Sequence, residues 1–332
     1  MDMTRGPVLA QMAKFALPVL FGMLCQRIYN FADTYIVGRF LGDEALAAMG
    51  AAGAVYDLLM GFAFGIGNGL AIVTARSFGS GDMEHLKKSV AASLVIGAGV
   101  TVIITVLVRF ILYPFLEVLN TPPEIIDQSY AYVSTITLFI VVMFAYNLCA
   151  GLLRAVGNSV MPLVFLILSS ILNIALDLFF IRRLHMGVQG AALATVIAQG
   201  VSVAACLVYI GKKVKILIPE RAHFVRDKEL YLEMLSQGLS MGFMNCIVTA
   251  GTAILQSGIN GLGYLVIAGH TAARKLYQFL MMPFIAMSQT VSTFVSQNRG
   301  AGQVVRIRKA VKYAYLYGAV MALVASVLML FF

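Results

Sequence analysis

Charged side chains are scarce in this sequence. Asp, Glu, Lys and Arg make up only 12% of its 332 residues, whereas hydrophobic residues make up 60%. An average soluble domain carries about 25% charged residues. Together with a mean hydropathy of +0.89, this composition excludes an ordinary soluble protein and predicts that a lipid bilayer is the main solvent of the chain.

Motifs of catalysis and metal binding are also missing. There is no Walker-type glycine-rich loop, no HExxH and no GxSxG, and the four histidines are scattered. The four cysteines lie inside apolar stretches without the spacing of a metal site, so we interpret them as packing residues. The sequence therefore favours a protein that is not an enzyme and does not draw on ATP. The first apolar segment also lacks a small-residue cleavage site, which argues against a removable signal peptide.

Long apolar runs dominate what is present. A helix needs about 20 apolar residues to cross a bilayer, and nine runs of this kind are separated by short polar stretches. We therefore predict an all-α integral membrane protein. The predicted spans are residues 15–37, 46–78, 89–112, 128–153, 160–181, 188–210, 235–258, 266–294 and 313–332.

Positive charges are unevenly distributed between these spans. If the N-terminus is cytoplasmic, 17 of the 24 Lys and Arg residues lie on the cytoplasmic side, four lie on the outer side and three lie within spans. Because Lys and Arg concentrate in cytoplasmic loops of membrane proteins, we predict a cytoplasmic N-terminus in a bacterial-type plasma (inner) membrane. This distribution accounts for the net charge of +9 without a nucleic-acid partner.

The chain contains an internal repeat. At an offset of 221 residues, the stretch 47–81 aligns with 268–302 without a gap, and the most informative matches are Tyr56 with Tyr277 and the Gly-x-Gly that ends both copies. The offset corresponds to six spans, so both copies run in the same direction. The repeat predicts a bundle of two six-helix lobes related by a parallel duplication.

The same repeat suggests how the chain is divided. We expect residues 1–210 to form the N-terminal lobe, residues 211–229, which are rich in Lys and Arg, to form a cytoplasmic linker, and residues 230–332 to form part of a C-terminal lobe. Only three spans of the second lobe are present, and the sequence stops inside an apolar run. We therefore expect a C-terminal truncation of a twelve-helix protein.

Several segments resemble the multidrug and toxic compound extrusion (MATE) transporters. They are LPVLFGMLCQRIYNFADTYIVGRFLGDEALAAMG, ARSFGSG, LLRAVGN, ILNIALDLFFI, GAALATVIAQ and VSQNRGAG. Their order agrees with that family over nearly the whole chain. The resemblance implies a cation-coupled antiporter with twelve helices in two lobes, which alternates between outward-open and inward-open states. The sequence departs from the family by lacking the last three helices.

Acids inside predicted spans are the candidates for coupling, because a charge in hydrocarbon is costly and is retained for a reason. From the rise of a helix, Asp33 and Asp177 lie about 9 Å and 8 Å below the outer boundary, and Thr195 lies about 10 Å into the next span. Asn173 is one turn from Asp177 on the same face. These depths predict one site that holds a proton or a hard cation such as Na⁺. The alternative is that these side chains only hydrogen-bond helices together.

The resemblance points to the same positions. The branch of the family that couples through its N-terminal lobe (DinF-like) uses an Asp on the first helix, an Asn and an Asp on the fifth, and a Thr on the sixth. The matching positions here are Asp33, Asn173, Asp177 and Thr195, with Tyr132 as a looser match on the fourth helix. Pro18 matches a proline at which the family's first helix bends. For Thr195 the alternative is a hydrogen bond to its own helix backbone.

The sequence predicts the substrate cleft less clearly than it predicts the coupling site. The 18 Met, 21 Phe and 14 Tyr residues supply adaptable and aromatic surfaces suited to binding hydrophobic cations. The run FLMMPFIAM at 279–287 is the best local candidate for a cleft wall, and we expect Pro283 to break its helix; a bent packing helix is the alternative. The candidate cleft residues are Asp57, Lys275, Gln278, Met281 and Met282.

The leading hypothesis is an H⁺- or Na⁺-coupled antiporter that exports amphiphilic, cationic drugs or toxic compounds. We expect a monomer in contact with membrane lipids, with no cofactor beyond the coupling ion. One alternative is a lipid-linked precursor flippase of the same superfamily, which would need a more basic cleft than Arg27, Arg274 and Lys275 offer. The other alternative is a truncated remnant that does not transport.

Overall fold

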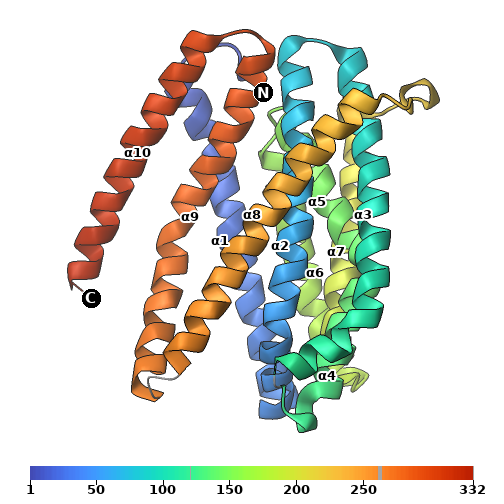
Figure 1. Cartoon of the computed structure of the whole chain (residues 1–332), viewed down its shortest axis with the longest axis vertical. Coiled ribbons are helices and arrows are strands. Elements are labelled where there is room, and N and C mark those ends of the chain that lie inside the picture. Colours follow the sequence, from blue (N-terminus) through green and yellow to red (C-terminus); the bar gives the residue numbers. More distant parts are fainter. Residues whose placement is uncertain (120, 261–263, 332) are drawn as a thin grey trace.

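The computed structural model describes residues 1–119, 121–260 and 264–331, and every regular element in these ranges is a helix (Figure 1). The α-helices are α1 (Val8–Leu41), α2 (Asp43–Ser80), α3 (Met83–Val118), α4 (Pro123–Leu138), α5 (Ile140–Ala155), α6 (Val160–Asp177), α7 (Gly187–Lys213), α8 (Lys228–Asn260), α9 (Tyr264–Gly300) and α10 (Val304–Phe331). A π-helical turn, η1 (Leu178–Arg183), extends α6, and two 3₁₀ turns, η2 (Lys215–Leu217) and η3 (Arg221–His223), lie between α7 and α8.

The helices correspond closely to the predicted spans. In the described residues, seven helices are long and apolar enough to cross a membrane, and α4 with α5 makes an eighth if the bent pair is one span. The seventh predicted span, 235–258, coincides with α8, which is continuous over 33 residues but is not among the candidates found in the described residues. Phe332, the predicted end of the last span, lies outside the described residues.

The fourth predicted span is not a single straight helix. Helices α4 and α5 meet at Phe139 and are bent by 52° relative to each other. Near the break, the Thr105 hydroxyl donates a hydrogen bond to the carbonyl of Thr137 (3.2 Å), and the Thr137 hydroxyl donates to the carbonyl of Val133 (2.8 Å). A hydroxyl group that bonds to the carbonyl four residues earlier in its own helix favours a bend, and the bond from Thr105 satisfies a carbonyl at the end of α4. The apolar pattern contains no proline at this point, so it did not predict the bend.

Neither proline singled out in the sequence ends its helix. Helix α9 continues from Tyr264 to Gly300 through Pro283, so the expectation that Pro283 breaks the helix is wrong. One proline removes one backbone hydrogen bond, and the turns on either side continue the helix. Pro18 likewise lies inside continuous α1, and a functional bend at Pro18 stays a prediction.

The parallel repeat is visible as a reciprocal contact between α2 and α9. A Cβ atom at Gly79 would collide with the backbone carbonyl of Gln297, and a Cβ atom at Gly300 would collide with the backbone carbonyl of Arg76. Gly300 is the repeat partner of Gly79, and Gln297 is the repeat partner of Arg76, each at the offset of 221 residues. Each contact is therefore the counterpart of the other, as a two-fold axis between the repeated units requires. The two-lobe, parallel-repeat fold is therefore confirmed, whereas the exact lobe boundaries at 210 and 230 stay a prediction.

Helices α2 and α8 pack backbone to backbone. A Cβ atom at Gly65 or Gly69 would collide with backbone atoms of α8, so these glycines allow the close approach. Further along, Arg76 donates hydrogen bonds to both carboxylate oxygens of Glu233, one of them at 2.6 Å. Glu233 precedes the predicted span of α8, and the Arg76 guanidinium holds the pKa of Glu233 below its ordinary value. This ion pair joins the two halves of the chain at the end that carries the N-terminus.

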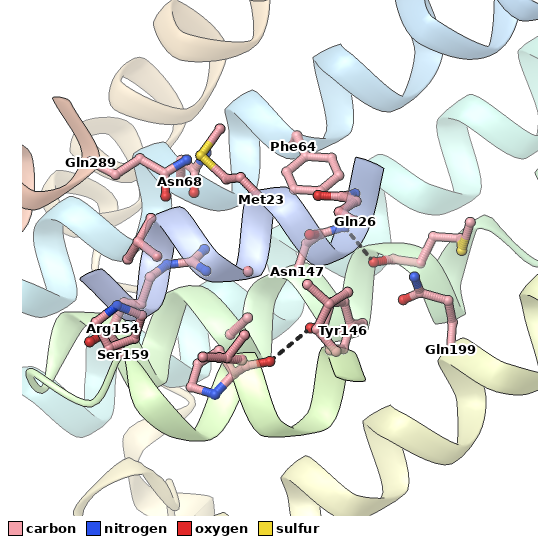
Figure 2. A pocket seen from close by; sticks show the side chains of 18 of the residues that line it. Met23, Gln26, Phe64, Asn68, Tyr146, Asn147, Arg154, Ser159, Gln199 and Gln289 are labelled. Carbon is pink, nitrogen blue, oxygen red and sulfur yellow. Dashed lines mark hydrogen bonds between the residues drawn. The ribbon is translucent and has the colours of Figure 1, made fainter. Parts of the chain in front are cut away.

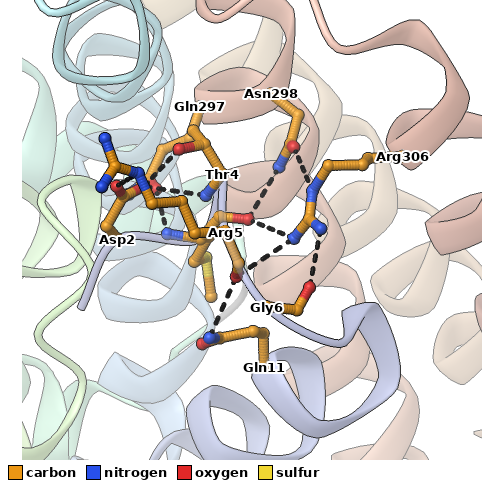
Figure 3. A network of polar contacts seen from close by, with 9 residues as sticks. Asp2, Thr4, Arg5, Gly6, Gln11, Gln297, Asn298 and Arg306 are labelled. Carbon is orange, nitrogen blue, oxygen red and sulfur yellow. Dashed lines mark hydrogen bonds and ion pairs between the residues drawn. The ribbon is translucent and has the colours of Figure 1, made fainter.

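The N-terminal segment strengthens the same end of the bundle. Figure 3 shows this segment beside the turn between α9 and α10. The backbone N–H of Met3 donates to Oε1 of Gln297 (3.0 Å), and Nδ2 of Asn298 donates to the carbonyl of Met3 (3.2 Å). The guanidinium of Arg306 donates to the carbonyl of Gly6 (2.7 Å) and to Oδ1 of Asn298 (2.9 Å). These bonds tie the start of the chain to α9 and α10.

Candidate functional site

Two buried acids face each other between α1 and α6. Asp33 is 9% exposed and Asp177, the last residue of α6, is fully buried. Their carboxyl groups interact with each other. No hydrogen-bond donor in the described part of the chain reaches Oδ1 of Asp33 or either oxygen of Asp177. A proton on one carboxyl group would supply the missing donor, because an ionised carboxylate only accepts hydrogen bonds.

An amide and a hydroxyl group complete the polar cluster. The Thr195 hydroxyl uses its proton on the carbonyl of Ala191 (3.1 Å), so its oxygen accepts from Nδ2 of Asn173 (3.2 Å). This fixes the Asn173 amide with Oδ1 turned away from Thr195, and Oδ1 has no donor among the described residues. Both hydrogen bonds that the sequence analysis offered as alternatives to a functional role are therefore present. Thr195 bonds to the backbone of its own helix, and Asn173 bonds to Thr195 on the neighbouring helix. They leave the Asn173 oxygen free to bind something else.

Two tyrosines adjoin the acids. Tyr132 on α4 lies within electrostatic range of both Asp33 and Asp177, as does Tyr29 on α1. Tyr132 was predicted from the sequence, whereas Tyr29 was not. The available signal was spacing, since Tyr29 precedes Asp33 by four residues and residues four apart share a helix face.

Together these residues form a cluster of acceptors. Four oxygens of the cluster have no donor in the part of the chain that the structure describes: Oδ1 of Asp33, Oδ1 of Asn173 and both carboxylate oxygens of Asp177. Two carboxylates in contact repel each other unless a positive charge lies between them. A shared proton or a hard cation with oxygen ligands would satisfy such a set. The π-helical turn η1 begins directly after Asp177, and such turns in α-helices often occur at functional sites.

The predicted cleft residues lie elsewhere. Asp57 on α2 is exposed, and its electrostatic neighbours are Arg27 on α1 and Arg274 on α9. Lys275 is exposed, and Met282 is 5% exposed. Gln278 and Met281 are half-buried. None of the five candidate cleft residues lines the two cavities described next, and their role in a substrate cleft stays a prediction.

Two adjoining cavities lie among the helices, and the first is lined by the part of α1 that precedes Asp33. They share Asn68, Arg154 and Gln289 and have volumes of about 110 Å³ and 200 Å³. Figure 2 shows the first cavity, which amide side chains line from several helices. Tyr29 and Pro18 also line it, so α1 contributes both to this cavity and to the acid pair. The amides that line these cavities, and Arg154, were not predicted from the sequence, because no spacing or pattern sets them apart from other polar residues of the spans.

Known proteins resemble this chain in sequence and in fold. Residues 18–179 and 241–332 match the family model MatE. The "Probable multidrug resistance protein YpnP" of Bacillus subtilis (strain 168) is 28% identical over 306 residues, which cover 92% of this chain and 68% of that protein. The "Multidrug export protein MepA" of Staphylococcus saprophyticus is 25% identical and covers 89% of this chain, which spans 65% of that relative. A solved structure of a MOP superfamily transporter from Pyrococcus furiosus superposes with a TM-score of 0.91 at 25% identity and covers 99% of this chain and 74% of that one.

Proposed function

This chain belongs to the MatE family of membrane transporters, and we propose that it exports amphiphilic, drug-like compounds by antiport against H⁺ or Na⁺. The observation that carries the proposal is the buried pair Asp33 and Asp177, in which Oδ1 of Asp33 and both oxygens of Asp177 have no hydrogen-bond donor among the described residues. Relatives named for multidrug resistance and multidrug export support the export of drugs.

Coupling would arise from the electrostatics of this pair. When a proton or Na⁺ is bound, the acids are neutralised and α1 can lie against α6. When the cation leaves, repulsion between Asp33 and Asp177 pushes the two helices apart. Because α1 also lines the cavity through Pro18 and Tyr29, movement of α1 changes the cavity as well. One helix would then link occupancy by the cation to occupancy by the substrate.

Alternating access would require the N-terminal end of the bundle to open. In this structure the contact of Gly79 with α9 and the Arg76–Glu233 ion pair join the two halves of the chain there. We propose that these contacts separate in the opposite state. The proposal includes a monomer in the inner membrane with its N-terminus and these contacts on the cytoplasmic side, following the distribution of Lys and Arg.

The proposal is tested by ethidium efflux from cells that express the chain. Efflux by the wild type should depend on an imposed proton or sodium gradient, and the effective gradient identifies the coupling ion. Asp33→Asn should abolish gradient-dependent efflux, whereas Asp43→Asn, which alters an exposed acid at the start of α2, should leave it unchanged. Properly inserted wild-type protein that extrudes no ethidium would contradict the proposal and favour the flippase or non-transporting alternatives.

A further inference from the structure

One charged side chain of the described residues, Arg154, lines the two cavities. No Asp or Glu in the described part of the chain lines either. The other lining groups are amides, hydroxyl groups and apolar side chains. Phe64 and three tyrosines offer aromatic rings to a cationic compound in the first cavity, but the described residues place no carboxylate there to pair with it. The charge in these cavities has the opposite sign.

Arg154 has no partner that explains its position. It lies half-buried in the last turn of α5, and its guanidinium makes no hydrogen bond or ion pair with any residue that the structure describes. Arg76 and Arg306, by contrast, are satisfied by a carboxylate and by backbone carbonyls. The C-terminus of α5 favours a cation, but this leaves five N–H donors without acceptors. A half-buried guanidinium of this kind is poised to receive an anion.

A second donor lies at the same end of the cavity. Ser159 is 5% exposed and is the first residue before α6, yet its side chain does not cap that helix. Figure 2 shows Ser159 beside Arg154, with Gln289 and Asn68 across the cavity. The N-terminus of an 18-residue helix also favours negative charge. The Arg154 guanidinium, the Ser159 hydroxyl and the N-terminus of α6 therefore all favour binding of an anion.

The rest of the first cavity is apolar enough to hold the body of an amphiphile. Met23 and Phe64 line it together with Leu163. Drug-sized pockets usually measure about 300–1,000 Å³, so cavities of 110 Å³ and 200 Å³ accommodate part of such a compound. We propose that Arg154 and Ser159 form an anion subsite that binds the carboxylate or phosphate group of an amphiphilic ligand. This rests on the proposed export function and extends its substrates from cationic to acidic and zwitterionic compounds.

Equilibrium binding of a matched pair of dyes tests the subsite. Rhodamine B carries a free carboxylate, and its ethyl ester keeps the same xanthene dye but replaces that charge with a neutral ester. With the full chain in phosphatidylcholine nanodiscs, Arg154→Gln should weaken binding of rhodamine B about tenfold, as expected for a lost charge-assisted hydrogen bond, and should leave binding of the ester nearly unchanged. Arg154→Lys should retain most of the discrimination. The control Arg183→Gln, at an exposed position, should bind both dyes as the wild type does.

Several outcomes would overturn the proposal. One is that Arg154→Gln weakens both dyes equally or neither. Should Arg154→Gln fail to fold, the wild type alone still decides, because 1-naphthoate should displace rhodamine B better than neutral 1-naphthamide, and equal displacement would contradict the subsite. Weaker rhodamine B binding in nanodiscs with phosphatidylglycerol would identify a lipid headgroup as the natural anion, and unchanged binding would identify an exported solute.

Binding needs no gradient, so the two proposals can fail separately. Ethidium efflux without discrimination between the dyes refutes the subsite alone. Discrimination between the dyes without efflux refutes export alone.

Discussion

Adding a methyl group at Gly300 should open the end of the bundle that carries the N-terminus. A Cβ atom at this position would collide with the carbonyl oxygen of Arg76 and would lie 2.8 Å from the backbone nitrogen of Ser80. Both obstacles are backbone atoms of α2, so no change of rotamer relieves the clash. The same holds at Gly79, where the obstacle is the backbone of Gln297. Only separation of α2 from α9 makes room.

The expected size follows from the energetics of overpacking. An extra methyl group in a well-packed contact costs about 1–3 kcal/mol, which corresponds to a shift of roughly 5- to 150-fold in an equilibrium between closed and open states. The backbone N–H of Met3, which precedes α1, bonds to Gln297 on α9, and we expect this bond to break when the two halves of the chain separate. Hydrogen exchange in residues 1–7 and 297–306 should therefore accelerate by a factor in that range in Gly300→Ala.

Hydrogen exchange with mass spectrometric detection measures this effect in detergent or nanodiscs. The matched control is Gly99→Ala on α3, where a Cβ atom would have no neighbour within 4 Å. A helical Gly→Ala change of this kind should stabilise by about 0.5–1 kcal/mol and leave the N-terminal end unchanged. Equal exchange rates at the N-terminal end in the two variants would refute the argument that the glycine contact holds this end closed.

Three further predictions concern other contacts. Thr195→Val should leave the α6 amide without an acceptor, at a cost of about 1–3 kcal/mol, and should lower the melting temperature, whereas Thr195→Ser should not; equal melting of the two variants would contradict this. Arg76 lowers the pKa of Glu233. The ion pair therefore stabilises the folded protein above the ordinary pKa of glutamate, and this stabilisation is lost as the pH falls through the lowered pKa. Because both side chains are about one-third exposed, the loss should cost at most about 1 kcal/mol. Protection from exchange at the start of α8, relative to the intrinsic rate at each pH, should thus fall in acid in the wild type and change little with pH in Glu233→Gln. Arg306→Gln should expose residues 1–7 to limited proteolysis, whereas Arg308→Gln, at an exposed position, should resist cleavage like the wild type.

The helical fold could be predicted largely from the sequence because each span is a long apolar run, and a helix is the element that satisfies its own backbone in lipid. The repeat at an offset of 221 also predicted the parallel architecture, since Gly79 and Gly300 are matched both in sequence and in the contact they make. The bend at Phe139 could not be predicted, because hydroxyl groups of Thr105 and Thr137 accompany it and no proline marks it.

The polar cluster was predictable only in part. Asp33 and Asp177 stand out because acids are rare in spans, and their depth along the helices predicted that they meet. The orientation of the Asn173 amide depends on a proton that Thr195 gives to its own helix, which no sequence pattern reveals. Arg154 was missed because a residue at the end of a span counts as a loop residue until packing places it beside a cavity.

Gradient-driven dye uptake into proteoliposomes tests the central claim most directly. Purified wild type should accumulate ethidium only under an imposed proton or sodium gradient. Asp177→Asn removes one of the two facing carboxylates, so it should bind ethidium normally and fail to accumulate it under either gradient. Accumulation by Asp177→Asn at the wild-type rate would contradict coupling at the pair of Asp33 and Asp177.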